Sequence, residues 1–414
     1  MKIAIVGAGA AGCFCAIELK RRMPYASVEV FEAGPKALAK VAITGGGRCN
    51  LTNSFEGISS LSAAYPRGDK LMKRLFRTFD QRSAWEWFED EGVKLVLQED
   101  HCVFPASQDA MEIVGTLLTR MRQAGVVLHT RHKVTGIFPR PECGYTLSVS
   151  EAVEAARVPE FSADIVVVTT GGSPKLSGLS MLDSLNLEII PPVPSLFTFN
   201  LPADPVRELM GTVVENASAS LAGTKFKANG PLLITHWGMS GPAILKLSSY
   251  AARYLADNEY SATLSVNWLG DSDEQEIRAR IMSVSKDNSQ KLILNPHPSE
   301  LPTRLWNYLI SKSGIREDSR WAELGSKGLN RLVNILINDG YQIRGKSRFK
   351  EEFVTCGGVS LSNINLSTLE CKTHPGLYFA GEVLDVDAIT GGFNLQAAWT
   401  MGYVVAQSVE SYFL

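Results

Sequence analysis

The chain has 414 residues, 45% of them hydrophobic and 20% charged, and a formal net charge of −2. This length exceeds the usual range of one hydrophobic core, so two or three domains are expected. The near-neutral charge excludes a strong long-range attraction to nucleic acid or acidic lipid. No apolar run approaches the roughly 20 residues that cross a bilayer, and no secretory signal pattern opens the sequence. We expect a cytoplasmic protein without nucleic-acid or membrane partners, whose oligomeric state stays open.

The seven cysteines are irregularly spaced and form no CxxC pair. This spacing argues against a zinc site and against a dithiol redox centre, so no metal site is predicted. A reducing compartment is the simplest interpretation of such cysteines.

The amino-terminal segment KIAIVGAGAAGCFCAIELKRR predicts a strand, a GxGxxG turn at Gly7, Gly9 and Gly12, and a helix. A second predicted strand, SVEVFEAG, carries Glu32 at 20 residues after Gly12. At this spacing a carboxylate can bind a ribose hydroxyl, while phosphates bind the helix amino terminus at Ala10 and Ala11. The segment therefore predicts an adenine-dinucleotide site.

The next segment, KVAITGGGRCNLTN at residues 40–53, predicts a polar loop facing the cofactor. Three glycines let backbone N–H groups approach a ligand where a Cβ would obstruct them. Arginine and lysine can offset phosphate or flavin charge, and asparagine can bind the flavin. The predicted cofactor contacts here are Lys40, Gly45, Gly46, Gly47, Arg48 and Asn50, whereas Cys49 is interpreted as a packing residue.

Three further segments belong to the amino-terminal part. Residues 70–92 predict one amphipathic helix, DAMEIVGTLLTRMRQAG a second helix, and VVLHTRHKVTGIFP one alternating strand. The apolar run in ADIVVVTTGGSP predicts a buried parallel strand that returns to the first sheet. It ends at the predicted cofactor contacts Thr170, Gly171 and Gly172.

The middle of the chain changes character twice. PPVPS at 191–195 marks a boundary, because prolines disrupt regular strand pairing. We expect a mainly β domain over 191–270, a helical insertion of three or four helices over 271–340, and a β return segment over 341–353. Within THWGMSGPAILKLS, a helix is predicted to begin at Ser240-Gly241-Pro242.

The carboxyl-terminal segment GLYFAGEVLDVDAITGGFNLQAAW predicts a strand, an acidic loop, a glycine pair and a closing helix. Residues 1–190 and 354–414 are thus expected to build one dinucleotide domain from both ends of the chain. FAD is favoured over NAD, because the second strand leads into the glycine triplet and not into regular βα repeats. The predicted contacts here are Gly381, Glu382, Asp387, Gly391, Gly392, Phe393, Asn394, Leu395 and Gln396.

Four blocks, GAGAAG, TGGGRCNLTN, THWGMSGPAILKLS and the carboxyl-terminal segment above, make the sequence resemble the BaiN-type family of FAD-dependent oxidoreductases, which includes aminoacetone oxidase-like flavoproteins. The resemblance implies an α/β fold: a discontinuous Rossmann-like FAD-binding domain with an inserted mainly β domain and a small helical insertion. By family analogy, Val134 is the candidate for binding the adenine edge. Where many members have GRVFP, this chain has HCVFP, so that Cys102 replaces an expected basic residue.

The resulting hypothesis is an FAD-dependent oxidoreductase that acts on a small organic substrate. NAD(P)H is a candidate transient electron donor, and the choice between reductase and oxidase stays open. His236 is the only histidine in a family-like block and is the candidate for proton transfer. Two alternatives are an RNA-modifying enzyme that uses the basic run RGKSRFK at 344–350, and a non-catalytic flavin sensor.

Overall fold

The computed structural model describes residues 1–151, 160–345 and 354–412. The chain divides into two compact units, one formed by Met1–Val193 with Val354–Leu414 and the other by Pro194–Phe353. The first unit is therefore assembled from both ends of the chain, with the second inserted between them. Residues 271–340 belong to the second unit, and the finer division at residues 270 and 340 stays a prediction.

Five parallel strands form the central sheet of the first unit. In spatial order they are β19 (Leu377–Phe379), β10 (Ile165–Val168), β1 (Lys2–Val6), β2 (Ser27–Glu32) and β6 (Val127–Thr130). β10 is buried along its whole length, as expected of a parallel strand covered on both faces. Its pairing with β1 on one side and β19 on the other confirms the discontinuous α/β fold.

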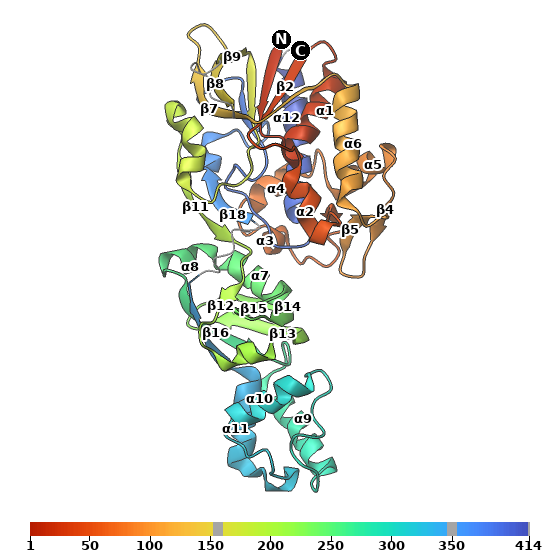
Figure 1. Ribbon diagram of the computed structural model, residues 1–414, viewed down its shortest axis with the longest axis vertical. Coiled ribbons are helices and arrows are strands. Elements are labelled where there is room, and N and C mark those ends of the chain that lie inside the picture. Colours follow the sequence, from red (N-terminus) through yellow and green to blue (C-terminus); the bar gives the residue numbers. More distant parts are fainter. Residues whose placement is uncertain (152–159, 346–353, 413–414) are drawn as a thin grey trace. The chain divides into compact units, whose positions relative to one another are not determined.

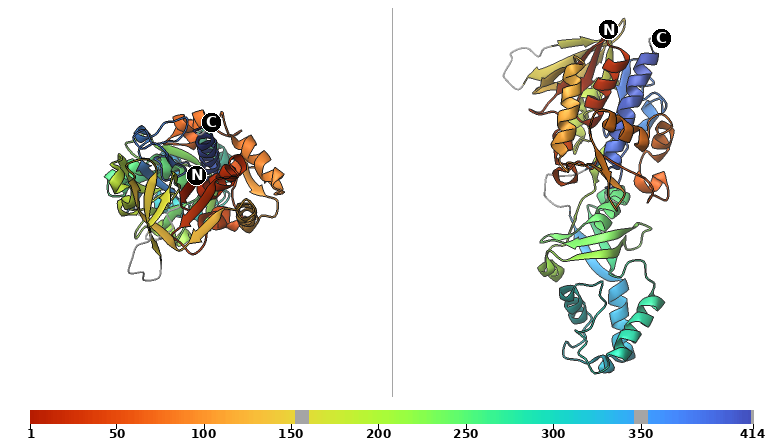
Figure 2. Two further views of the ribbon diagram at one scale, coloured as in Figure 1. Left: turned by 90° about the horizontal axis from the view of Figure 1, so that it is seen from above. Right: turned by 90° about the vertical axis from the view of Figure 1, so that its right-hand side faces the viewer.

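Two helices from opposite ends of the chain pack against each other in this unit. α1 (Ala10–Arg22) and α12 (Phe393–Ser411) lie side by side in Figure 1 and in the right-hand view of Figure 2. A Cβ on Gly402 of α12 would lie 2.9 Å from the carbonyl oxygen of Ala11, so glycine permits this close approach. α6 (Ala110–Gln123) runs beside α1 (Figure 1).

The segment 126–139 forms two strands, where the sequence predicted one. β6 ends at Thr130 in the parallel sheet, and β7 (His132–Pro139) begins a separate antiparallel sheet with β8 (Tyr145–Glu151) and β9 (Glu160–Ala163). Arg131 between them has φ of 60°, and its N–H donates to the carbonyl of Gly34 at 2.9 Å. A left-handed residue breaks the extended run, which hydrophobic alternation alone does not reveal.

The single helix predicted over residues 70–92 is also wrong, because the segment forms two helices. α4 (Asp69–Leu75) ends before the turn that precedes α5 (Gln81–Asp90). Asp80 accepts hydrogen bonds from the backbone N–H groups of Arg82 at 3.1 Å and Ser83 at 2.9 Å. This side chain caps the start of a new helix and so interrupts the amphipathic pattern.

The proline-rich boundary forms a strand, contrary to the expected loss of pairing. β11 (Ile189–Ser195) and β18 (Val354–Val359) make a two-stranded sheet. Each strand of such a sheet has one neighbour, so one edge of β11 requires no N–H donors and tolerates proline. The unit also contains α2 (Ala39–Gly47), α3 (Leu61–Ala64), η1 (Leu176–Leu185), η4 (Leu361–Asn363) and the sheet β3 (Thr52–Asn53), β5 (Cys102–Pro105), β4 (Leu95–Leu97).

A six-stranded antiparallel sheet organises the second unit. Its order is β12 (Phe199–Asn200), β15 (Gly238–Ser240), β14 (Lys227–Ile234), β13 (Val213–Leu221), β16 (Ser261–Asn267) and β17 (Asp339–Arg344). Its helical elements are η2 (Pro205–Leu209), α7 (Pro242–Tyr250), α8 (Ala252–Asp257), α9 (Glu274–Asp287), α10 (Thr303–Lys312), η3 (Trp321–Glu323) and α11 (Gly325–Ile337). α7 begins at Pro242, as the sequence predicted. None of the helices in the described ranges is long and apolar enough to span a membrane.

One hydrophobic core joins the sheet and the helices of this second unit. The buried cluster includes Leu264 and Val266 of β16 together with Trp306 of α10 and Leu332 of α11. The buried carboxylate of Asp339 adds a polar link between them. It accepts a hydrogen bond from the indole N–H of Trp268 at 2.9 Å and from the Lys312 ammonium at 2.5 Å.

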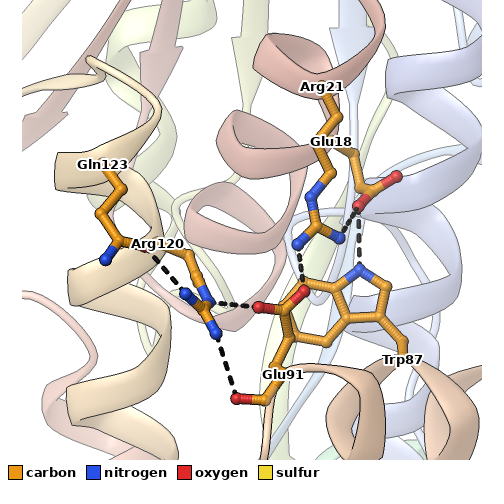
Figure 3. A network of polar contacts seen from close by, with 6 residues as sticks. All are labelled: Glu18, Arg21, Trp87, Glu91, Arg120 and Gln123. Atoms are coloured by element: carbon orange, nitrogen blue, oxygen red, sulfur yellow. Dashed lines mark hydrogen bonds and ion pairs between the residues drawn. The ribbon is translucent and has the colours of Figure 1, made fainter.

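In the first unit, an ion-pair network around two buried carboxylates ties α1 to α5 and α6 (Figure 3). The Glu18 carboxylate accepts hydrogen bonds from the Trp87 indole N–H at 2.8 Å and from Arg21 at 3.0 Å. Arg21 and Arg120 both pair with the carboxylate of Glu91. Because Glu18 and Glu91 are each less than a tenth exposed, both carboxylates depend on these partners.

We expect Glu18→Ala to lower the free energy of unfolding by about 2 kcal/mol, because it leaves the buried indole N–H of Trp87 without an acceptor. Urea unfolding followed by far-UV circular dichroism measures the change. Glu89→Ala removes an exposed carboxylate of α5 as the control and should change stability by less than about 0.5 kcal/mol. Equal effects of the two substitutions would contradict the role assigned to this network.

Candidate functional site

The loops predicted to bind a dinucleotide meet at one edge of the parallel sheet. β1, β2, β10 and β19 run in the same direction, so their carboxyl ends share that edge. Ligands of open α/β sheets bind in the crevice outside these strand ends. The predicted residues that directly follow or end these strands are Gly7, Gly9, Ala10, Ala11, Gly12, Glu32, Thr170, Gly171, Gly172, Gly381 and Glu382.

In the first glycine loop, two glycines lie so close to neighbouring backbone atoms that a side chain would collide, and one glycine faces open space. Gly7 has φ of 105°, and a Cβ there would lie 2.6 Å from the carbonyl oxygen of Thr169. A Cβ on Gly12 would lie 2.1 Å from the carbonyl oxygen of Gly7. A Cβ on Gly9 would meet no atom within 4 Å, and Gly9 caps α1 without a side-chain hydrogen bond. The start of α1 therefore presents backbone donors on a side that a ligand can approach.

Glu32 closes this loop from the neighbouring strand. Its Oε2 accepts a hydrogen bond from the N–H of Ala8 at 2.9 Å, and its Oε1 accepts one from the N–H of Gly34 at 2.7 Å. Each carboxylate oxygen has a second lone pair, so these bonds orient the side chain and leave acceptor capacity for a ribose hydroxyl. The structure thus keeps Glu32 beside the glycine loop, as the spacing predicted.

The glycine triplet leaves a helix and forms a left-handed backbone turn. α2 extends formally through Gly47, but Gly45, Gly46 and Gly47 have φ of 58°, 69° and 84°. A Cβ on Gly45 would lie 2.9 Å from the N atom of Asn50, whereas a Cβ on Gly46 or Gly47 would meet no atom within 4 Å. Successive backbone N–H groups in such conformations can form an anion-binding concavity.

Two exposed cations border this turn. The guanidinium of Arg48 stacks over the ring of Phe104 at 4.4 Å and donates to Gln108 at 3.4 Å. The ammonium of Lys40 lies 3.7 Å from Glu382, whose Oε1 accepts a hydrogen bond from the N–H of Thr355 at 2.7 Å. A Cβ on Gly172 would lie 2.3 Å from that carboxylate and 2.7 Å from the Cβ of Thr355, so the glycine leaves room for both side chains.

The glycine pair Gly391–Gly392 contacts the segment that follows the glycine triplet. When the Asn50 amide is oriented to satisfy its hydrogen bonds, it donates to the carbonyl of Thr52 at 3.0 Å and accepts from the N–H of Gly392 at 3.3 Å. The amide of Asn53 donates to the carbonyl of Gly391 at 3.0 Å. Gly392 caps α12 with φ of 89° and no side-chain hydrogen bond, so α12 also begins with backbone donors.

Several predicted contacts in the first turn of α12 are engaged within the protein. Asn394 donates to the carbonyl of Ala388 at 3.0 Å and accepts from the N–H of Ala388 at 2.9 Å. The buried amide of Gln396 bonds to the hydroxyls of Thr52 at 2.5 Å and Thr400 at 3.1 Å. The Asn394 amide therefore holds the preceding loop, and the Gln396 amide links α12 to β3. Phe393 is buried and Leu395 is half-buried.

Asp387, also predicted to contact the cofactor, has a fully buried carboxylate that forms an ion pair with Arg67 through two hydrogen bonds. Sequence reasoning missed Arg67, Tyr65 and Asn53. No local pattern connects them to residues more than 300 positions later in the chain, so only the tertiary structure reveals their contacts.

Two predicted residues lie outside this group. Val134 is buried in β7, where it pairs with Val149 of β8. His236 lies in the second unit with an exposed imidazole, and its carbonyl oxygen accepts a hydrogen bond from Arg207 at 2.7 Å. Both assignments stay predictions. Of the basic run at 344–350, residues 346–350 lie outside the described residues.

Two buried thiols, Cys49 directly after the triplet and its arginine and Cys102 of β5, are protonated at neutral pH. Burial raises the pKa of Cys49 to about 12 and that of Cys102 to about 11. A thiol whose pKa lies this high provides almost no thiolate, the form that acts as nucleophile or metal ligand. Cys49 therefore acts as a packing residue, as the sequence indicated.

The residues at this edge fit an adenine dinucleotide. Open glycine positions at Gly9, Gly46, Gly47 and Gly171 leave room for a ligand against the backbone. The helix starts at α1 and α12 lack side-chain caps, and both favour anionic groups such as a pyrophosphate. Glu32 supplies an acceptor for a ribose hydroxyl, and Lys40 and Arg48 supply positive charge.

We expect Gly12→Ala to destabilise the protein by about 3 kcal/mol and to abolish copurification of FAD, because its Cβ would collide with the backbone of Gly7. Urea unfolding and the flavin absorbance of the purified protein test this. Gly115→Ala on α6 is the matched control: its Cβ meets no atom within 4 Å, so it should raise helix stability by up to about 1 kcal/mol. A Gly12→Ala protein with normal stability and FAD content would refute the packing argument.

Comparison with known proteins finds similarity along nearly the whole chain. A family model described as the HI0933-like protein Rossmann domain matches residues 1–408. A ribosomal RNA dihydrouridine synthase from Escherichia coli is 29% identical over 98% of this chain and 97% of its own. A 3-dehydro-bile acid delta(4,6)-reductase from Clostridium scindens is 26% identical over 98% of each chain.

Among solved structures, the FrdA subunit of E. coli quinol fumarate reductase has a TM-score of 0.52 at 14% identity, with 99% of this chain and 70% of that chain covered. This likeness shows the fold alone. The family match spans both halves of the discontinuous domain and agrees with its dinucleotide-binding geometry. The chain belongs to the HI0933-like family of Rossmann-fold, FAD-dependent oxidoreductases.

Proposed function

We propose that this enzyme reduces a carbon–carbon double bond conjugated to a carbonyl group. The observation that carries the proposal is the chemistry shared by two relatives that match end to end. Dihydrouridine forms when the ring double bond of uracil, which is conjugated to a carbonyl, is saturated. A delta(4,6)-reductase of a 3-dehydro bile acid saturates double bonds conjugated to the 3-oxo group. The two substrates differ, but the reacting group is the same.

The reaction needs a hydride at the carbon β to the carbonyl and a proton at the α carbon. FAD, when bound and reduced, supplies the hydride. The chain's residues bind and orient it: the open glycines admit it to the backbone, and the exposed cations Lys40 and Arg48 favour its negative charge. His236 stays the sequence-based candidate for the proton. NAD(P)H is the proposed electron donor, and it binds transiently because no second GxGxxG unit occurs in the sequence.

For the substrate, we propose the uracil ring of ribosomal RNA as the first candidate. Relatives from Escherichia coli and Haemophilus influenzae, 29% and 28% identical, both carry the ribosomal RNA dihydrouridine synthase name and match this chain over 98% of its length. This proposal departs from the expectation of a small organic substrate and no nucleic-acid partner. The small-molecule alternative keeps the support of the bile acid relative and of the formal net charge of −2, which gives RNA little long-range attraction.

We expect anaerobic NADH or NADPH to bleach the bound flavin, and an unmodified ribosomal RNA transcript to restore its absorbance. Stopped-flow absorbance measures both steps, and mass spectrometry of digested RNA should show uridine that has gained two hydrogens. A 3-oxo-4,6-diene bile acid forms the parallel arm. A transcript containing dihydrouridine in place of uridine and the saturated bile acid are the controls, because neither has a double bond to reduce.

Each result separates the candidates. Reoxidation by RNA alone identifies the nucleic-acid substrate, and reoxidation by the dienone alone identifies the small-molecule class. Rapid reoxidation by oxygen with no response to either substrate would replace the reductase by an oxidase. A flavin that neither pyridine nucleotide reduces would refute the proposed donor.

A further inference from the structure

The carboxyl-terminal loop is held by a short segment from the amino-terminal part of the chain. We call residues 64–68 the clamp segment. Its backbone accepts a hydrogen bond at Ala64 from the N–H of Ile389 at 2.9 Å, and Arg67 forms an isolated antiparallel bridge with Asp387. The hydroxyl of Tyr65 donates to the carbonyl of Phe393 at 2.8 Å. The clamp segment thus contacts the loop at Asp387 and Ile389, before the Gly391–Gly392 pair, and contacts Phe393, the first residue of α12, after it.

Steric fit adds to these bonds. Gly68 has φ of 82°, and a Cβ there would lie 2.6 Å from a methyl group of Val386. Phe393 at the beginning of α12 packs edge-on against Phe55 with ring centroids 5.0 Å apart. Since the loop is enclosed in this way, a change in the clamp segment reaches the start of α12, where the uncapped backbone donors lie.

The main contact of the clamp segment is the ion pair between Arg67 and Asp387, which has little access to water. The side chain of Asp387 is 0% exposed and that of Arg67 is 17% exposed. Burial lowers the pKa of Arg67, but the hydrogen bonds and charge of Asp387 outweigh it, so the pKa stays above its ordinary value. Cys356 and Asp385 also raise the pKa of this guanidinium through Coulomb interactions. Arg67 is therefore the cation that offsets a buried carboxylate in the loop predicted to face the cofactor.

We propose that Arg67 is a positioning residue whose charge, set against Asp387, shapes the FAD-facing loop at residues 381–392 and tunes the reduction potential of the bound flavin. The inference rests on FAD binding and on the loop facing FAD, and it does not depend on which substrate is reduced. Reduction adds negative charge to the cofactor. An unneutralised carboxylate buried beside it would oppose that change, because Coulomb interactions are strong where water is excluded.

The test compares Arg67→Met, Arg67→Lys, Asp387→Asn and the double variant R67M/D387N. Arg67→Met should shift the flavin potential to more negative values and weaken FAD binding by about tenfold or more. Arg67→Lys retains the charge and should keep most of the wild-type potential. The double variant removes both charges, so its potential should return towards the wild-type value. Dye-coupled anaerobic reduction gives the potential, and FAD titration of apoprotein gives the affinity, both without substrate.

Arg22→Met is the matched control, because Arg22 forms a 2.8 Å ion pair with Glu410 in the same unit but away from the loop. It should lower the thermal unfolding midpoint, leave the flavin potential at the wild-type value and change the FAD affinity by less than about twofold. An unchanged potential in Arg67→Met, or an equal shift in the single and double variants, would overturn the proposal. If Arg67→Met does not retain FAD, affinity decides: recovery in the double variant supports the charge role, and equal loss in both rejects it.

Discussion

The packing of α12 against α1 is the contact on which the FAD domain depends. It brings the last helix of the chain onto the first βα unit, so the loop before α12 reaches the carboxyl edge of the sheet. Glycine permits the helix contact at Gly402 of α12, and at Gly381 it permits the loop after β19 to approach α1. A Cβ on Gly402 would lie 2.9 Å from the carbonyl oxygen of Ala11, and a Cβ on Gly381 would lie 3.2 Å from the Cβ of Ala11. Bulkier residues would separate the helices and move the carboxyl-terminal loop away from the glycine turn.

This arrangement collects complementary groups from distant parts of the chain. Backbone donors come from two helix starts, an acceptor comes from Glu32, and positive charge comes from Lys40 and Arg48. Each group alone is an ordinary feature of a folded protein, and together they suit a molecule with phosphates and a ribose. Two relatives that match the chain nearly end to end are a ribosomal RNA dihydrouridine synthase and a 3-dehydro-bile acid delta(4,6)-reductase.

Prediction from sequence succeeded where residues obey a fixed spacing and failed where hydrophobic periodicity alone set the length of an element. The first βα unit was predicted because its strand, glycines, helix and acid lie within 32 residues and obey fixed spacings. The two errors of helix and strand length arose at single residues: the side chain of Asp80 caps a new helix, and Arg131 adopts a left-handed conformation. Hydrophobic periodicity is nearly unchanged by such residues, so it extended each element across the break. The two units divide between Val193 and Pro194, within the predicted boundary at 191–195, but the prolines do not abolish strand pairing there, because β11 has a single neighbouring strand.

By itself, the sequence determined the α/β class and the glycine turn between the first strand and the first helix, because backbone geometry imposes these residue types locally. Only the tertiary structure decided which polar side chains face the ligand edge and which hold the loops. The amides of Asn394 and Gln396 were predicted as cofactor contacts, yet both have hydrogen-bond partners within the protein, and the carboxylate of Asp387 pairs with Arg67. The partner of a buried polar group can lie 320 residues away, as it does for Arg67 and Asp387, and the spacing of residues along the chain carries no trace of that contact.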